Sequence, residues 1–330
     1  MAWALVNHAL SDTFLNDFFD RNAARQYSKK LLFSNIFALI NLVVTRVKSS
    51  VGEALRSKLV PVDVSDQAFY AKLNSIEPAL CEALVRETSQ RLAAVSRAIG
   101  NEKPAPLPGY RTIIIDGNAI GASEHRIDEL QEIPSAPMPG KSIVFLDPQH
   151  TRATEMIACE DGWAQERSMS DEIIKRICVG DLAIADRNFC TKKLLFGIHD
   201  QGGSFIIRQH KSLPWEACGP LELVGENEEG RFLEQQIFIK QEDGSSLAMR
   251  RIVIEFQKKK TTRDGDRTIA LLTILPQSVA DAMKVGVSAC STFHLCDDTC
   301  CLKRAINTPC HHSFRARLCR RSCSFIILSC

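Results

Sequence analysis

The sequence lacks the features that would place it in several common protein classes. Its longest apolar run, residues 36–44, is interrupted by Asn41 and is too short to cross a bilayer. The start, MAWALVNHALSDTF, has neither the basic segment nor the small-residue cleavage site of a signal peptide. The net charge of +2 gives no global attraction to nucleic acid, so any such surface must be a local patch. We therefore expect a cytoplasmic protein with no membrane segment.

Glycine-rich phosphate loops are also missing, since GNAIGASEH (residues 117–125) matches neither the P-loop nor the dinucleotide-binding pattern. The 13 cysteines are spread unevenly, because eight of them lie in residues 290–330. The other five are isolated beside mostly apolar residues, which predicts reduced core thiols; they are Cys81, Cys159, Cys178, Cys190 and Cys218.

Residues 1–105 are predicted to be helical. In residues 78–99, apolar side chains recur every three or four positions and form one stripe, and Ser65 is placed to cap a short helix ending near Asn74. This region suits either a helix-turn-helix-like DNA-binding unit or a plain helical bundle. Three prolines within EKPAPLPG, residues 102–109, predict a linker after it.

Residues 106–212 change to a pattern of short apolar strands and helices. The order is three strands, a helix, a strand, a helix and a strand, which predicts an α/β unit with a mixed sheet. The strands are expected in residues 110–120, 141–148, 153–162, 181–189 and 204–210, and the helices in 164–177 and 191–202.

Residues 213–276 are predicted to be β-rich. Three stretches alternate or run apolar, RFLEQQIFIK, SLAMRRIVIEF and RTIALLTIL, with turn residues between them. One of the turns carries a basic cluster that is either a solvated loop or a phosphate contact; it consists of Lys258, Lys259, Lys260 and Arg263.

Two aspartates, Asp116 and Asp186, each follow an apolar strand directly. If the two strands are neighbours, the carboxylates meet at one edge of the sheet, where they would bind Mg²⁺ or Mn²⁺. With a third carboxylate, such a site holds two ions about 3.5–4 Å apart and acts on phosphate esters. The alternative is that each aspartate caps a turn. Asp147 and Asp161 also follow strands. Pro148 and Gly162 come directly after them and favour a turn role for both, but spacing alone does not separate them from the pair.

A resemblance to a known family does separate them. The blocks IIIDGNAI, PGKSIVFLDPQ, CEDGWAQERS and LAIADRNFCT together resemble bacterial insertion-sequence transposases of the IS-four type, the DDE class, over roughly residues 20–285. The resemblance implies an RNase H-like mixed sheet with flanking helices, a helical N-terminal DNA-binding region and a β-rich insertion after the fifth strand. It implies that Asp116 and Asp186 are the first two of three catalytic, metal-binding carboxylates. It also implies metal-dependent cleavage and strand transfer on double-stranded DNA by two assembled protomers.

The resemblance ends after about Gly286. The family's third carboxylate is a Glu on a helix after the insertion, but no Glu follows Glu255. Residues 277–330 are thus interpreted as the remnant of a core helix followed by a Cys-rich tail, disordered or irregular, produced by a frame change near Gly286. A small zinc module using His311 and His312 is the other interpretation of the tail. Asp297 or Asp298 would replace the missing Glu only if placed very accurately.

Three functions remain open at this point. The chain is a DNA transposase impaired by the missing carboxylate, a catalytically dead DNA-binding protein that occupies element ends or inhibits transposition, or an inert product. The frame change further predicts that one face of the core sheet is left uncovered, because the covering helix would be lost.

Overall fold

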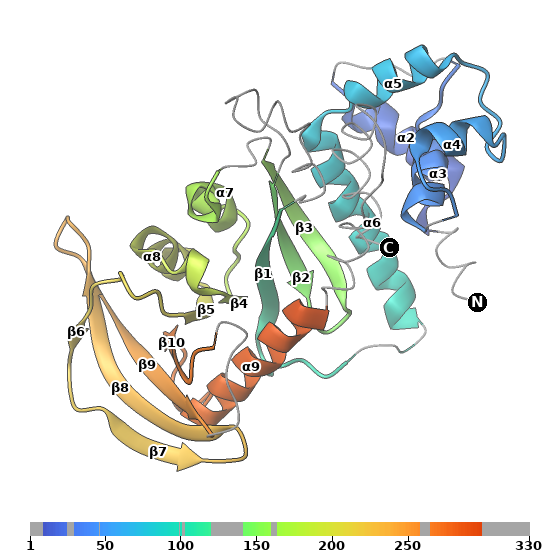
Figure 1. Cartoon of the computed structure of the whole chain (residues 1–330). Coiled ribbons are helices and arrows are strands. Elements are labelled where there is room, and N and C mark those ends of the chain that lie inside the picture. The colour runs from blue at the N-terminus through green and yellow to red at the C-terminus, as the bar shows by residue number, and fades with distance from the viewer. Residues whose placement is uncertain are drawn as a thin grey trace.

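The computed structural model describes residues 9–24, 30–45, 47–98, 100, 103–119, 141–159, 164–257 and 265–298. These residues form a mixed α/β fold around one ten-stranded sheet (Figure 1). None of the helices within these ranges is long and apolar enough to cross a membrane.

Within the described residues, five helices precede the sheet, and the first four gather beside the fifth (Figure 1). Their shared core is rich in phenylalanine, with Phe18, Phe19 and Phe33 fully buried. The predicted cap at Ser65 is confirmed, because its hydroxyl accepts the Ala68 N–H at 3.2 Å. The helices are α2 (Asp12–Asn22), α3 (Phe33–Val44), α4 (Val51–Arg56), α5 (Asp66–Asn74) and α6 (Pro78–Ala98).

Residues 103–110 form no helix or strand and connect α6 to the sheet. The first three strands form an antiparallel meander, after which β4 and β5 run parallel to the first. This confirms the predicted order of three strands, helix, strand, helix and strand. The elements are β1 (Arg111–Ala119), β2 (Lys141–Asp147), β3 (Arg152–Cys159), the 3-10 helix η3 (Glu166–Met169), α7 (Ser170–Ile174), β4 (Asp181–Ala185), the 3-10 helix η4 (Arg187–Phe189), α8 (Lys192–Asp200) and β5 (Ser204–Arg208).

The β-rich region continues the same sheet, because β10 pairs antiparallel with β5. The strand order is β3-β2-β1-β4-β5-β10-β9-β8-β6, with β7 also pairing with β8. The three long strands match the three predicted stretches, whereas β6 and β7 were not predicted. The elements are β6 (Glu216–Ala217), β7 (Glu222–Glu226), β8 (Gly230–Lys240), β9 (Ser246–Phe256), β10 (Thr268–Thr273) and the helix α9 (Ala282–Asp298).

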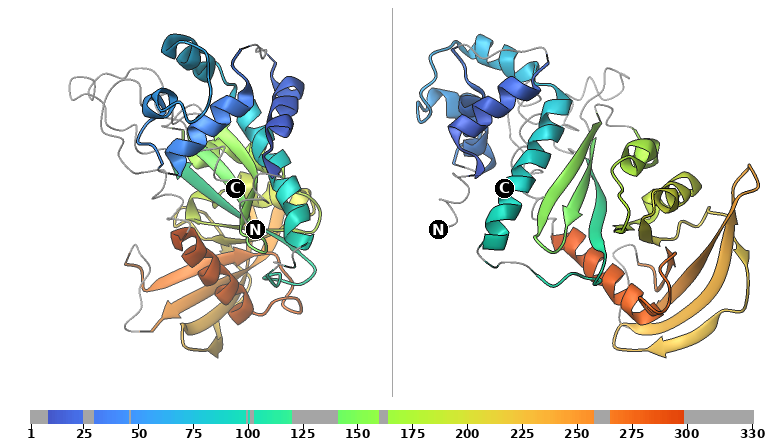
Figure 2. Two further views of the ribbon diagram at one scale, coloured as in Figure 1. Left: turned by 90° about the vertical axis from the view of Figure 1, so that its right-hand side faces the viewer. Right: turned by 180° about the vertical axis from the view of Figure 1, so that it is seen from behind.

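Helices cover both faces of the sheet, as Figures 1 and 2 show for α6 on one side and for α7 with α8 on the other. One face packs against α7 and α8 through a cluster that includes Ile115, Phe145 and Leu195. The opposite face is divided between α6, which packs on β3, and α9, which packs on β8 and β9.

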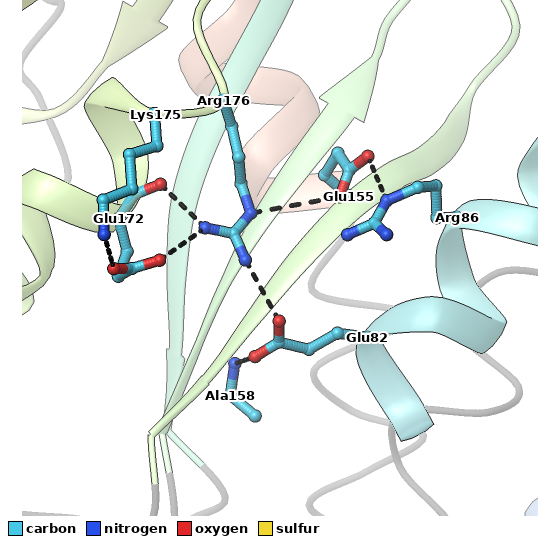
Figure 3. Close-up of polar contacts among 7 residues, drawn as sticks. All are labelled: Glu82, Arg86, Glu155, Ala158, Glu172, Lys175 and Arg176. Carbon is cyan, nitrogen blue, oxygen red and sulfur yellow. Dashed lines mark hydrogen bonds and ion pairs between the residues drawn. The ribbon is translucent and has the colours of Figure 1, made fainter. Parts of the chain in front are cut away.

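An arginine at the end of α7 joins α6 to the edge of the sheet (Figure 3). The Arg176 guanidinium donates to Glu172 at 3.0 Å and to Glu82 of α6 at 3.0 Å, and its Nε lies 3.9 Å from Glu155 of β3. Arg86 pairs with the same Glu155 at 2.8 Å. Because these residues come from three elements on both faces of the sheet, the cluster holds the N-terminal helices against the edge strand β3.

Two expectations about helices are wrong within the described residues. The helix predicted in residues 164–177 is shorter, consisting of η3 and the single turn of α7. The face expected to be uncovered is covered, because α9 continues past Gly286 to Asp298 and buries Val285 and Ala289 against the sheet. The tail from residue 299 onward, with its predicted irregular structure and alternative zinc module, lies outside the described residues.

The isolated cysteines are only partly core residues. Cys81 and Cys190 are buried, and burial raises the pKa of the Cys81 thiol to about 12. Cys159 is half-buried, whereas Cys178 and Cys218 are exposed, so the prediction of core thiols is wrong for these last two.

Candidate functional site

The two predicted aspartates lie side by side at one edge of the sheet. Strands β1 and β4 are parallel neighbours, and their last paired residues are Ile115 and Ala185. Asp116 and Asp186 are the next residues along each strand. They also lie on one face of the sheet. Ile114 and Ile184 are paired across the two strands, and each aspartate comes two residues after one of them, which returns its side chain to the same face. The chain thus brings together carboxylates that are distant in sequence.

The local sequence explains why Asp186 stands where β4 ends. All five residues of β4 are buried, which suits a central parallel strand with helices on both faces. Asp186 then caps the short helix η4, and its Oδ1 accepts the Asn188 N–H at 2.8 Å. The capping alternative is therefore confirmed for Asp186. It does not compete with the pairing, because a carboxylate oxygen used for capping leaves the other oxygen available.

The surroundings of Asp186 shift its pKa in both directions. Burial raises the pKa of Asp186 above its ordinary value, and the nearby charge of Asp116 raises it further. The Asn188 amide and the charges of Arg187 and Arg208 lower the same pKa, but the net direction is upward. The two half-buried carboxylates repel each other, so a cation bound between them would stabilise the folded protein.

Two arginines and a third aspartate surround the pair, and sequence analysis did not single them out. Arg208 at the end of β5 donates to Asp266 at 2.6 Å, and Arg187 lies 3.8 Å from the same Oδ2 atom. Asp266 precedes β10, whose antiparallel pairing with β5 brings its start to the end of β5. The only sequence signal was the turn RDGDR, which contains Asp266 but does not identify its partner.

Glu166 approaches the pair from the opposite face. A Cβ atom at Gly117 would overlap the Glu166 carboxylate, so a larger residue at this position would displace the Glu166 side chain. Because Gly117 follows Asp116 by one residue, its free side faces α7 and α8. Consistent with this separation, the described part of the chain holds no group of three or more His, Cys, Asp or Glu side chains arranged to bind a metal ion.

The remaining candidates have other roles or are not described. Asp147 accepts the backbone N–H groups of Gln149 and His150 at 2.9 and 3.2 Å, which confirms its predicted turn role. Asp161 and the basic cluster of residues 258–263 lie outside the described residues. Asp297 and Asp298 lie in α9, but their side chains are not described, so their replacement of the missing Glu stays a prediction.

Neither a scan against models of known protein families nor a search of curated proteins finds a match to this chain.

We expect Asp186→Asn to stabilise the protein at neutral pH. The pKa of Asp186 is higher in the folded protein than in the unfolded chain, so the folded protein favours the protonated carboxyl group. The resulting stabilisation is complete below the unfolded-state pKa of about 3.9 and is lost as the pH rises through the folded-state pKa. Asparagine removes the repulsion and still accepts the Asn188 N–H. The expected gain at pH 7 is about 0.5–2 kcal/mol, as for other single stabilising substitutions.

Urea unfolding of both proteins between pH 4 and pH 7 measures this difference. The gain should shrink as pH falls through the folded-state pKa of Asp186. Asp171→Asn is the control, because Asp171 is exposed and pairs with Lys193 at the surface. A variant that is less stable than the wild type at pH 7 would contradict the electrostatic interpretation.

Proposed function

We propose that this chain is a DNA transposase of the insertion-sequence type, with an RNase H-like core and a divalent-metal site at Asp116 and Asp186. The observation that carries the proposal is the convergence of these two carboxylates at the point where the parallel pairing of β1 and β4 ends. The chain also has the other parts that the resemblance implies: N-terminal helices, a β-rich region after the fifth strand, and a helix after that region.

The residues present fit a divalent cation. Carboxylate oxygens are the hard ligands that Mg²⁺ and Mn²⁺ prefer. Burial, and after it the charge of Asp116, raises the pKa of Asp186, and a bound cation would offset both effects. When bound, the ion would stabilise charge developing at phosphorus and lower the pKa of an attacking water or hydroxyl. The protein's part is to fix Asp116 on β1 and to orient Asp186 through its bond to the Asn188 N–H.

A second candidate function is DNA binding without catalysis. It is favoured by the absence of a third convergent carboxylate among the described residues and by the absence of any Glu after Glu255. Such a protein would occupy the ends of an element or interfere with an active assembly.

Divalent cations should stabilise the wild-type protein through the aspartate pair. A ligand at one hundred times its dissociation constant adds about 2.7 kcal/mol, so Mg²⁺ or Mn²⁺ at saturating concentration should raise the melting temperature by several degrees. Asp116→Asn and Asp186→Asn should each abolish the metal-dependent rise. Asp147→Asn is the matched control, because Asp147 also follows a core strand but contacts His150 and Arg152 instead.

Nicking of supercoiled plasmid DNA in Mn²⁺ then separates the two candidate functions. Metal-dependent nicking that disappears in Asp186→Asn supports the transposase. A gel shift of duplex DNA without nicking supports the binding protein. If the melting temperature of the wild type does not respond to either cation, the metal site is refuted.

A further inference from the structure

A basic cavity lies at the chain segment that directly follows Asp186. Its volume is about 260 Å³, and it is lined by the segments that follow β4 and β5 together with the start of α8. The charged and polar lining includes Arg167, Arg187, Lys192 and His210, and none of its lining residues is Asp or Glu. The charged residues of the lining are therefore all basic, and one of them, Arg187, follows Asp186 directly in the sequence.

We propose that this cavity binds a phosphate group of the DNA strand whose neighbouring phosphate lies at Asp116 and Asp186. This inference rests on the proposed function and adds a second contact to it. In this proposal the cavity holds the DNA strand in place. The carboxylate pair cannot do so alone, because carboxylates repel phosphate unless a cation lies between them.

The cations of the cavity are available to a ligand to different degrees. Arg187 already lies 3.8 Å from Asp266. By contrast, the side chains of Arg167 and Lys192 make no hydrogen bond or ion pair with any other part of the chain that the structure describes. Two cations at one cavity without a counter-charge are the usual arrangement of a phosphate site.

The backbone adds donors to the same cavity. Lys192 is the first residue of α8, a helix of nine residues whose cap is Thr191. The positive end of this helix therefore faces the lining, and the N–H groups of a first turn favour anions. His210 also lines the cavity, and its Nδ1 lies 3.2 Å from the Ser212 backbone nitrogen.

Nothing in the lining opposes a phosphate. Burial raises the pKa of the Cys190 thiol to about 11, so this residue stays neutral at physiological pH. The volume is below the range of about 300–1,000 Å³ that is typical of sites for complete small molecules. A phosphate group on a continuous strand suits this size, because the rest of the strand lies outside the cavity.

The position also suits a strand that reaches the carboxylates. Arg187 and Asn188 follow Asp186 directly within η4, so the cavity and the pair share one turn of chain. Ligands of α/β sheets bind at the carboxyl ends of parallel strands, and β4 and β5 both end here.

Binding of a labelled random-sequence duplex to the full chain tests the inference, in EDTA and reducing agent so that no metal site contributes. Arg167→Gln and Lys192→Gln should each weaken binding about tenfold, as expected for one charge-assisted contact. Each should also reduce the slope of log affinity against log salt by about one. Lys193→Gln is the matched control, because it removes the same charge from the next residue, which pairs with Asp171 outside the lining.

Equal losses in the control and the cavity variants, or no loss in any of them, would overturn the inference. The source of the phosphate is tested separately with inorganic phosphate in a thermal shift. If phosphate stabilises the wild type but not the cavity variants, while duplex affinity is unchanged among all of them, the cavity binds free phosphate and the DNA contact is refuted.

The two proposals fail separately. Stabilisation by Mg²⁺ that is lost in Asp186→Asn and kept in Arg167→Gln would support the metal site even if duplex binding shows no cavity contact. Conversely, a cavity-dependent duplex affinity in EDTA does not depend on any metal bound at the carboxylates.

Discussion

Arg250→Met should lower the free energy of unfolding by about 3–5 kcal/mol, the cost of leaving a buried charge without its partner. Arg250 of β9 is 5% exposed and donates to both oxygens of Glu234 on β8, at 2.7 and 2.8 Å. The same guanidinium donates to the carbonyl groups of Leu275 and Ala280, at 3.0 and 2.7 Å. The substitution thus leaves Glu234, itself 8% exposed, with only the long bond from the Gln236 amide at 3.4 Å, and it removes the guanidinium donor of two carbonyl groups.

Urea unfolding measures this loss, and Arg231→Met is the matched control. Arg231 lies in the same hairpin and pairs with Glu255 at 3.1 Å, but both of these side chains are about half exposed. Exposed pairs contribute at most about 1 kcal/mol, so the control should change stability little. The double variant Arg250→Met with Glu234→Leu should recover much of the loss. A single Arg250 variant as stable as the control would contradict the prediction.

The buried ion pair between Glu234 and Arg250 also shows why the sequence predicts the positions of the strands better than the contacts of their side chains. The three long strands of residues 213–276 were predicted because their side chains alternate or run apolar. Glu234 and Arg250 lie within these strands and look like solvent-facing residues. Their burial depends on the segment that includes Leu275 and Ala280, which folds over the β8–β9 hairpin after the last strand. No local pattern carries that information.

The candidate site was predictable for a related reason and to a limited extent. Asp116 and Asp186 converge because a strand that returns through a helix usually becomes a parallel neighbour. Pattern analysis could therefore place both residues at one edge of the sheet, although only the resemblance separated them from Asp147. The contact between Arg208 and Asp266 was not predictable, because it depends on β10 pairing with β5 after a long excursion of the chain.

The helix α9 shows where composition misled the prediction. The change in composition near Gly286 was interpreted as the loss of a core helix. Yet Val285 and Ala289, four residues apart, are both buried against the sheet, so the helical period continues across this point. Small side chains make this contact, and their weak hydrophobicity hides the pattern from a sequence reading.

Gly286→Leu should therefore lower the free energy of unfolding by about 2 kcal/mol or more. A Cβ atom at Gly286 would overlap the ring of Phe232 on β8 and would lie 3.0 Å from the Cδ1 atom of Ile254 on β9. Both side chains are fully buried and have no room to move. Overpacking of this kind costs about 1–3 kcal/mol or more, and a leucine adds several further atoms. The better helix propensity of leucine, about 1 kcal/mol relative to glycine, offsets only part of the cost.

Urea unfolding again supplies the measurement, with Val287→Ala as the control from the next position of the same helix. Val287 is 45% exposed, so its truncation should change stability by no more than about 0.5 kcal/mol. Gly286→Ala should fall between the two, because its gain in helix propensity opposes a smaller overlap. If Gly286→Leu is as stable as the control, α9 does not pack on β8 and β9 in solution. The face of the sheet would then be uncovered, as the frame change near Gly286 predicts.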